Sequence, residues 1–202
     1  MHTNTALSAH FYSYRPRLII IGSSTGGPLA LQQILSQLPA DYPTPILVVQ
    51  HMPANFTGTF AVRLNSLCQI NVKQAQQGDI IQSGQAYIAP GGQQMLLKNY
   101  HQQLSLHITH SSTSDPFHPC IDRTLLSVTT ICPEETLVII LTGMGSDGKK
   151  GCETLKQYHT KIWSQDKKSC VVYGMPKAIA KADLADKILN PYQIGQHLLR
   201  LT

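Results

Sequence analysis

The sequence is poor in charged and aromatic residues and contains no long hydrophobic run. Charged residues make up 13% and aromatic residues 6% of the 202 residues, whereas apolar residues make up 42%. This apolar content excludes an intrinsically disordered chain, because it is sufficient to bury a core. No apolar run approaches the roughly 18 residues that span a bilayer, and residues 1–14 lack the features of a secretory signal. We therefore expect a cytoplasmic protein that is not inserted in a membrane.

The cysteines and histidines show no spacing that is typical of a disulfide framework or of a metal site. The chain has five cysteines, none of them in a CxxC pair, and its nine histidines form no HExxH motif. An odd number of unpaired cysteines is more typical of small buried thiols. We therefore expect no bound metal ion.

The positive charge is concentrated in the last quarter of the chain. Ten of the 16 Lys and Arg residues follow Gly148, but only four of the 11 Asp and Glu residues do. This segment therefore has a net charge of +6 and the rest of the chain has a net charge of −1, which together give +5. No helix-turn-helix, zinc-finger spacing or aromatic RNA-binding strand accompanies these lysines. We expect no nucleic-acid partner, and we interpret the basic segment as a solvated face or as a surface that meets an acidic protein.

The order of hydrophobic patterns predicts the fold class. Residues 1–16 are polar and predict a flexible N-terminal tail, and residues 17–202 predict a single domain. In this domain, short β-branched runs alternate with apolar residues at helical spacing. This alternation predicts an α/β fold with a doubly wound, mostly parallel sheet, in a Rossmann-like three-layer α/β/α arrangement with an antiparallel edge hairpin.

Individual segments follow from the same patterns. The strands of the main sheet are predicted at 18–21, 46–49, 70–75, 137–141, 161–163 and near 188. Helices are predicted at about 29–38, 56–67 and 120–131, after Gly148, from 176 and from 191. Residues 87–89, 95–97 and 104–108 are predicted to be antiparallel strands at one edge.

The glycine-rich loop after the first predicted strand reads Gly-Ser-Ser-Thr-Gly-Gly-Pro over residues 22–28. A dinucleotide-binding GxGxxG motif would need glycine at position 24, and a P-loop would need lysine in place of Pro28. The loop instead matches GxSxG, which places Ser24 on a sharp turn between a strand and a helix. The first N–H groups of that helix would stabilise an anionic intermediate beside Ser24. Alternatively, Ser24 only caps the helix.

A histidine and an aspartate follow two other predicted strands. His51 comes after the second strand, and Asp147 lies in a glycine-rich loop after the strand 137–141. Neighbouring parallel strands end at the same edge of a sheet, about 5 Å apart. This arrangement predicts a catalytic triad, with Ser24 as nucleophile, His51 as general base and Asp147 as the group that orients the imidazole. Taken singly, His51 could be an ordinary loop residue and Asp147 a cap for the next helix.

Five segments of the chain, in the same order, resemble the catalytic domain of the chemotaxis protein-glutamate methylesterases, the CheB family. The resemblance extends from about Arg17 to Leu201. The five segments are IIGSSTGG (20–27), QHMP (50–53), YIAPG (87–91), LTGMGSDG (141–148) and SCVVYGMP (169–176).

The resemblance implies an enzyme that removes methyl groups from glutamate γ-methyl esters on the cytoplasmic helices of chemoreceptors and releases methanol. It implies the roles already assigned to the triad, and it allows deamidation of receptor glutamines as a second activity. Thr25 and Met144 would line the oxyanion pocket, with backbone N–H groups as donors. No cofactor is needed for this reaction, and we expect the protein to be a monomer.

The chain also differs from the family pattern. His118 occupies a position that is more often arginine, and Lys167 and Lys168 stand in a loop that is commonly acidic. The family usually carries a phosphoacceptor receiver domain before the esterase domain, and we expect this chain to lack one. An alternative to the enzyme is a non-catalytic binding module of the same fold that meets a signalling partner through its basic surface, but the intact Ser, His and Asp set favours the enzyme.

Overall fold

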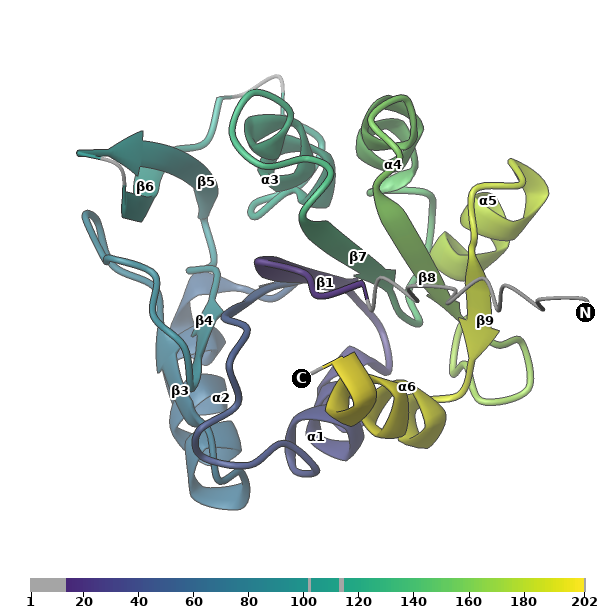
Figure 1. Ribbon diagram of the computed structural model, residues 1–202, viewed down its shortest axis with the longest axis horizontal. Coiled ribbons are helices and arrows are strands. Elements are labelled where there is room, and N and C mark those ends of the chain that lie inside the picture. Colours follow the sequence, from purple (N-terminus) through teal and green to yellow (C-terminus); the bar gives the residue numbers. More distant parts are fainter. Residues whose placement is uncertain (1–13, 102, 113–114, 202) are drawn as a thin grey trace, which may run out of the picture.

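Buried strands that are rich in β-branched residues form a parallel sheet at the centre of the fold. In the computed structural model, which describes residues 14–101, 103–112 and 115–201, seven strands follow the order β3-β4-β2-β1-β7-β8-β9 (Figure 1). They are β1 (Leu18–Ser23), β2 (Ile46–Gln50), β3 (Asn71–Gln74), β4 (Gln85–Ile88), β7 (Thr136–Ile140), β8 (Lys161–Gln165) and β9 (Lys187–Leu189). Strands β1, β2 and β7 are buried along their whole length, as expected for a parallel sheet that is covered on both faces.

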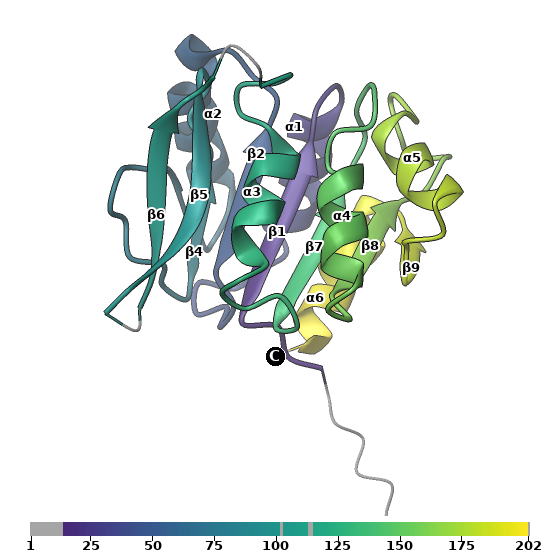
Figure 2. The ribbon, with the colours of Figure 1, turned by 90° about the horizontal axis from the view of Figure 1, so that it is seen from above.

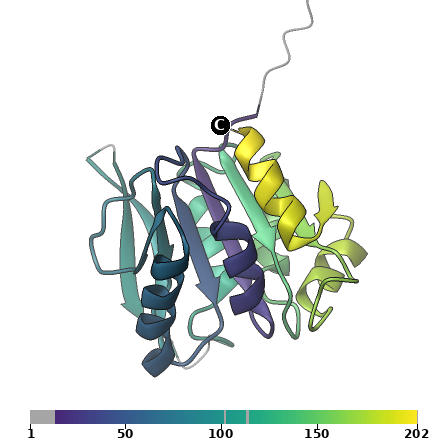
Figure 3. The same ribbon diagram turned by 90° about the horizontal axis from the view of Figure 1, so that it is seen from below.

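Helices cover the two faces of the sheet. One face carries α1 (Gly27–Leu35), α2 (Ala54–Leu67) and α6 (Pro191–Leu198), which is followed by the 3-10 turn Leu199–Leu201 (Figure 3). The other face carries α3 (Ile121–Val128), α4 (Lys149–Lys156) and α5 (Met175–Lys181) (Figure 2). Alternate residues of β1 pack into the two layers, because successive side chains of a strand point to opposite faces. The predicted three-layer, doubly wound fold is confirmed.

The antiparallel strands lie outside the main sheet. Strands β5 (Gln93–Tyr100) and β6 (Gln103–His110) form a separate two-stranded sheet, and the apolar residues of this hairpin belong to the same core as those of α3 (Figure 1). The prediction that residues 87–89 belong to this antiparallel group is wrong. Tyr87 and Ile88 belong to β4, which is parallel and lies between β2 and β3. A four-residue run between turns does not reveal its pairing partner, because that partner is distant in the sequence.

The predicted N-terminal tail is only partly described. Residues 1–13 lie outside the described residues. At its end, the hydroxyl of Tyr14 donates a 2.8 Å hydrogen bond to the carbonyl of Thr136, so this residue is tied to the start of β7. Within the described ranges, no helix has the length and apolar character needed to cross a membrane.

The topology determines where a site can form. The chain adds strands to one side of β1 and then returns to add β7 on the other side. In such sheets the loops diverge at this reversal and leave a crevice at the carboxyl edge. The loops after β1, β2 and β7 meet there, and these loops carry Ser24, His51 and Asp147.

Candidate active site

Ser24 lies in the turn between β1 and α1. Its N–H donates to the carbonyl of Thr142 (3.0 Å), and its carbonyl accepts from the N–H of Gly27 (2.8 Å). The N-cap of α1 is Gly26, which has a left-handed φ of 83° and forms no side-chain capping bond. Glycine is required there, since a Cβ would overlap Val171 and strain the backbone. Ser24 therefore does not cap α1, and the capping alternative is wrong.

His51 lies at the same edge, one residue beyond β2. The register places Ser23 opposite Gln50, and the N–H of His51 donates to the carbonyl of Ser23 at 3.0 Å. Ser24 and His51 are consequently neighbours at the ends of paired strands. The His51 ring stacks on Phe117, with 4.4 Å between ring centroids and 13° between the planes. This stacking restrains the imidazole plane, and sequence reasoning did not identify Phe117.

The Asp147 carboxylate connects His51 to the start of α3. Its Oδ2 atom lies 2.7 Å from Nε2 of His51 and accepts from the N–H of Ile121 at 2.7 Å. Its Oδ1 atom accepts from the N–H groups of Asp122 and Gly148, both at 3.0 Å. Asp147 thus binds the free N–H groups at the start of α3. The alternative prediction was that Asp147 caps α4, the helix that follows it in the sequence. The N-cap of that following helix is Gly148.

The surroundings of Asp147 favour its ionised form. Burial by itself raises the pKa of Asp147, but the hydrogen bonds from His51, Asp122 and Ile121 outweigh it and leave this pKa below its ordinary value. The positive end of the α3 dipole acts in the same direction. Burial raises the pKa of Asp122 to about 6, and the Asp147 charge adds to the rise. Burial also raises the pKa of Cys120 to about 12, so its thiol stays protonated and donates to Oδ1 of Asp147 at 3.3 Å.

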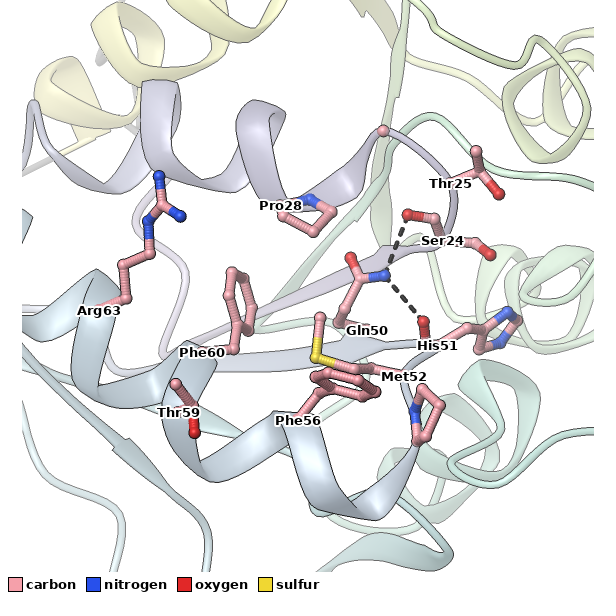
Figure 4. A pocket seen from close by; sticks show the side chains of 12 residues that line it. Ser24, Thr25, Pro28, Gln50, His51, Met52, Phe56, Thr59, Phe60 and Arg63 are labelled. Carbon is pink, nitrogen blue, oxygen red and sulfur yellow. Dashed lines mark hydrogen bonds between the residues drawn. The ribbon is translucent and has the colours of Figure 1, made fainter.

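Gln50 connects the two turns that carry Ser24 and His51, and sequence reasoning did not identify this role. Its side-chain nitrogen donates to the carbonyls of Ser24 and His51, both at 3.0 Å (Figure 4). Its side-chain oxygen accepts from the hydroxyl of Ser23 at 2.7 Å. The residue is only 2% exposed. A side chain at Gly27 would overlap the Gln50 oxygen, which explains the second glycine of the loop.

The two residues expected in the oxyanion pocket lie in different surroundings. Thr25 lines a hollow of about 520 Å³ together with Ser24 and His51 (Figure 4). Met144 is 69% exposed in the loop after β7 and is not among the residues that line this hollow. Its neighbour Gly143 nevertheless touches the site, because a Cβ at that glycine would lie 2.7 Å from Cβ of Ser24. The loop that carries Met144 therefore borders Ser24.

The positions that depart from the family pattern lie on loops. His118 precedes a cis peptide bond to Pro119, and its carbonyl accepts from the N–H of Gly92 at 3.1 Å. Lys167 and Lys168 are exposed in the loop after β8. Among residues 14–101, 103–112 and 115–201, no three His, Cys, Asp or Glu side chains form a group that could hold a metal ion.

Comparisons with known proteins identify the family of the chain. A family model described as CheB methylesterase matches residues 19–198. The chain is 49% identical over 183 residues to the protein-glutamate methylesterase/protein-glutamine glutaminase 1 of Vibrio vulnificus (strain YJ016), which covers 91% of this chain and 49% of that protein. It is 53% identical over 174 residues to the protein-glutamate methylesterase/protein-glutamine glutaminase of Pseudoalteromonas translucida, which covers 86% of this chain and 44% of that protein. The chain thus spans about half the length of these curated relatives.

A solved structure has the same fold over nearly its whole length. The crystal structure of the Thermotoga maritima CheB methylesterase catalytic domain superposes with a TM-score of 0.89 at 40% sequence identity. The match covers 93% of this chain and 99% of that domain. The family model, the curated relatives and the solved structure all match most of this sequence, and the chain belongs to the CheB methylesterase family.

Proposed function

We propose that this chain hydrolyses the γ-methyl esters of glutamate residues in chemoreceptors, with Ser24 as nucleophile, His51 as general base and Asp147 as the group that orients His51. The observation that carries the proposal is the 2.7 Å contact between His51 and Asp147 beside Ser24. The names of relatives that are about half identical to the chain over the aligned region support the same reaction.

The proposed reaction has two steps. In the first, Oγ of Ser24 attacks the ester carbonyl carbon, and its proton passes to Nδ1 of His51, because Nε2 of the same ring is held by Asp147. The tetrahedral intermediate then breaks the bond to the methoxy oxygen, His51 returns the proton to that oxygen, and methanol leaves. In the second step, water attacks the carbonyl carbon of the acyl-enzyme while His51 takes a proton from the water. The bond to Oγ of Ser24 then breaks, His51 returns the proton to this oxygen, and a free glutamate side chain leaves. With a glutamine substrate, ammonia would leave in place of methanol.

The surroundings of Ser24 and Asp147 suit the charges that form during this reaction. The N-terminus of α1 lies directly after Thr25, so its N–H groups would stabilise the oxyanion together with those of the Met144 loop. Asp147 carries the negative charge that stabilises protonated His51, and its pKa is already lowered by the hydrogen bonds described above. All of these groups belong to the protein, and the mechanism therefore requires no cofactor.

The test is hydrolysis of a methylated receptor fragment, measured as methanol release. Ser24→Ala and His51→Ala should each lower kcat by several orders of magnitude and leave the circular dichroism spectrum unchanged. The double variant should be little worse than either single variant, because the members of a triad act as a unit. Full activity in Ser24→Ala would exclude this serine as the nucleophile, and additive losses would argue against a shared step.

A chemoreceptor substrate also defines the setting of the reaction. The methylated segments of such receptors lie in the cytoplasm, and we place the active chain there as a monomer. The basic last quarter of the sequence would face the acidic side chains that surround the modified glutamates. Sedimentation of the purified chain measures its oligomeric state directly.

A further inference from the structure

A groove leads away from Ser24 between α1 and α2. The hollow of about 520 Å³ beside Ser24 shares Pro28, Phe60 and Arg63 with a second hollow of about 230 Å³. The two hollows are therefore adjacent, and we call the larger one, which contains Ser24, the groove. In Figure 4, Ser24 and Arg63 lie at opposite ends of the first hollow.

One face of α2 forms a wall of this groove. Phe56, Thr59, Phe60 and Arg63 recur at the i, i+3, i+4 and i+7 positions, so they share one side of the helix. Phe60 is 9% exposed, whereas Phe56 is 56% exposed at the rim. Pro28 lines the same hollow from the α1 side. Exposed apolar surface of this kind beside a reactive serine is typical of a surface that binds a partner.

The charge in the groove has one sign. Arg63 is the only Asp, Glu, Lys, Arg or His in either α1 or α2. No Asp or Glu lines either hollow. Within the described part of the chain, Arg63 takes part in none of the seven ion pairs. A carboxylate from a bound molecule would therefore meet an unopposed guanidinium group, which suits carboxylate geometry.

We propose that this groove binds the segment of the substrate protein that flanks the esterified glutamate, and that Arg63 binds a carboxylate of that segment. The inference rests on the proposed function, because the groove opens at Ser24. The occupant is an amphipathic helix that presents an apolar side chain and an acidic side chain on the face that carries the ester. Residues 1–17 of this chain contain no Asp or Glu, so they lack the chemistry that Arg63 selects.

The first test measures the preference for an acidic neighbour. Two helical peptides carry the same γ-methyl glutamate and differ only in Glu or Gln at positions one or two turns away on the same face. We expect the parent chain to show a kcat/KM about three- to fivefold higher on the acidic peptide, the range of a partly exposed ion pair. Arg63→Gln should remove this preference. Arg63→Glu should reverse it in favour of a peptide with Lys at the same positions.

Two matched controls separate the groove from general effects of charge and apolar surface. Arg200→Gln makes the same change at an exposed arginine in the 3-10 turn after α6, and it should keep the preference. Val62→Ser alters a residue of α2 that is 71% exposed and does not line the groove, and it should leave KM unchanged. Phe56→Ser should raise KM for both peptides. A preference that survives Arg63→Gln, or that Arg200→Gln also removes, would overturn the inference.

A binding measurement makes the inference testable without turnover. Fluorescence anisotropy with labelled peptides and the Ser24→Ala chain should show the same preference for the acidic peptide and its loss in Ser24→Ala, Arg63→Gln. If turnover does not depend on Ser24 but this binding preference persists, the proposed function fails and the inference about the groove still holds. If turnover depends on Ser24 but binding shows no preference, only the groove inference fails. A dimer that dissociates in Phe56→Ser, with peptide binding unchanged, would identify the groove as a contact between copies and overturn the inference.

Discussion

Replacing Gln50 with methionine should disconnect the turns that carry Ser24 and His51. Methionine has a similar length and no amide, so it removes the two 3.0 Å bonds to these carbonyls and the 2.7 Å bond from Ser23. Each lost hydrogen bond costs about 1 kcal/mol in net stability. The three together should lower the free energy of unfolding by about 3 kcal/mol. In a domain of this size, that loss lowers Tm by about 6 to 12 °C.

The loss of activity should exceed the loss of stability. A displacement of about 1 Å between reacting groups can reduce a rate by about 100-fold. We therefore expect Gln50→Met to lower kcat by about this factor at a temperature where the variant remains folded. The matched control is Thr160→Val. Thr160 lies just before β8, at the opposite edge of the sheet, and the change removes its partly buried 2.7 Å bond to the carbonyl of Pro133. The control should lose stability and keep kcat.

Gln50→Glu tests the same site through its charge. A glutamate still accepts from Ser23, but it cannot donate when ionised and would lie between two carbonyl oxygens at a position that is only 2% exposed. The pKa of the introduced carboxyl would be raised in the folded state. The stability of the Gln50→Glu variant would therefore be highest below about pH 4 and would fall as pH rises. Equal kcat losses in Gln50→Met and Thr160→Val, or a Tm difference between the two Gln50 variants that does not vary with pH, would refute the reasoning.

Three further predictions concern neighbouring charges. Asp147→Asn should lower kcat by about 1,000- to 10,000-fold in the methanol assay, because an amide does not stabilise protonated His51. Burial raises the pKa of Asp122 from 3.8 to about 6, so its contribution to stability is complete below about pH 4 and is lost as pH rises through 6. Asp122→Asn should therefore raise Tm relative to the parent at pH 8 but not at pH 4. If Lys167 and Lys168 steer an acidic receptor, reversing both charges or adding salt should slow the receptor reaction but not hydrolysis of a small neutral ester; an equal response of both substrates would exclude steering.

The layered fold could be predicted because the relevant signals are local. The β-branched runs at β1, β2 and β7 and the helical spacing after them determine which segments are buried. The place of β4 could not be predicted in the same way. Its hydrogen bonds go to β2 and β3, and pairing between segments that far apart is decided by packing of the whole sheet.

The same distinction applies to the site. Ser24, His51 and Asp147 could be placed at one edge because Ser24 and His51 directly follow buried strands and Asp147 lies in the loop after a third; the catalytic roles of all three remain predictions. The contribution of Gln50 could not be predicted, because it depends on where one amide points among three backbone segments. Phe117 lies in an irregular segment between β6 and α3, where no periodicity indicates what its ring contacts.

The chain has few charged residues, and this site is held together mainly by hydrogen bonds to backbone groups. Asp147 receives three backbone N–H groups, and Gln50 donates to two backbone carbonyls. Backbone dipoles thus stabilise the polar side chains at this edge of the sheet, a role that ion pairs have in many other proteins. These dipoles are fixed by the fold and lie in buried surroundings. Salt screens exposed charges over about 8 to 10 Å but has little effect on buried groups. Ionic strength should therefore alter how fast an acidic substrate reaches the site, through Arg63 and the exposed lysines, and leave kcat nearly constant.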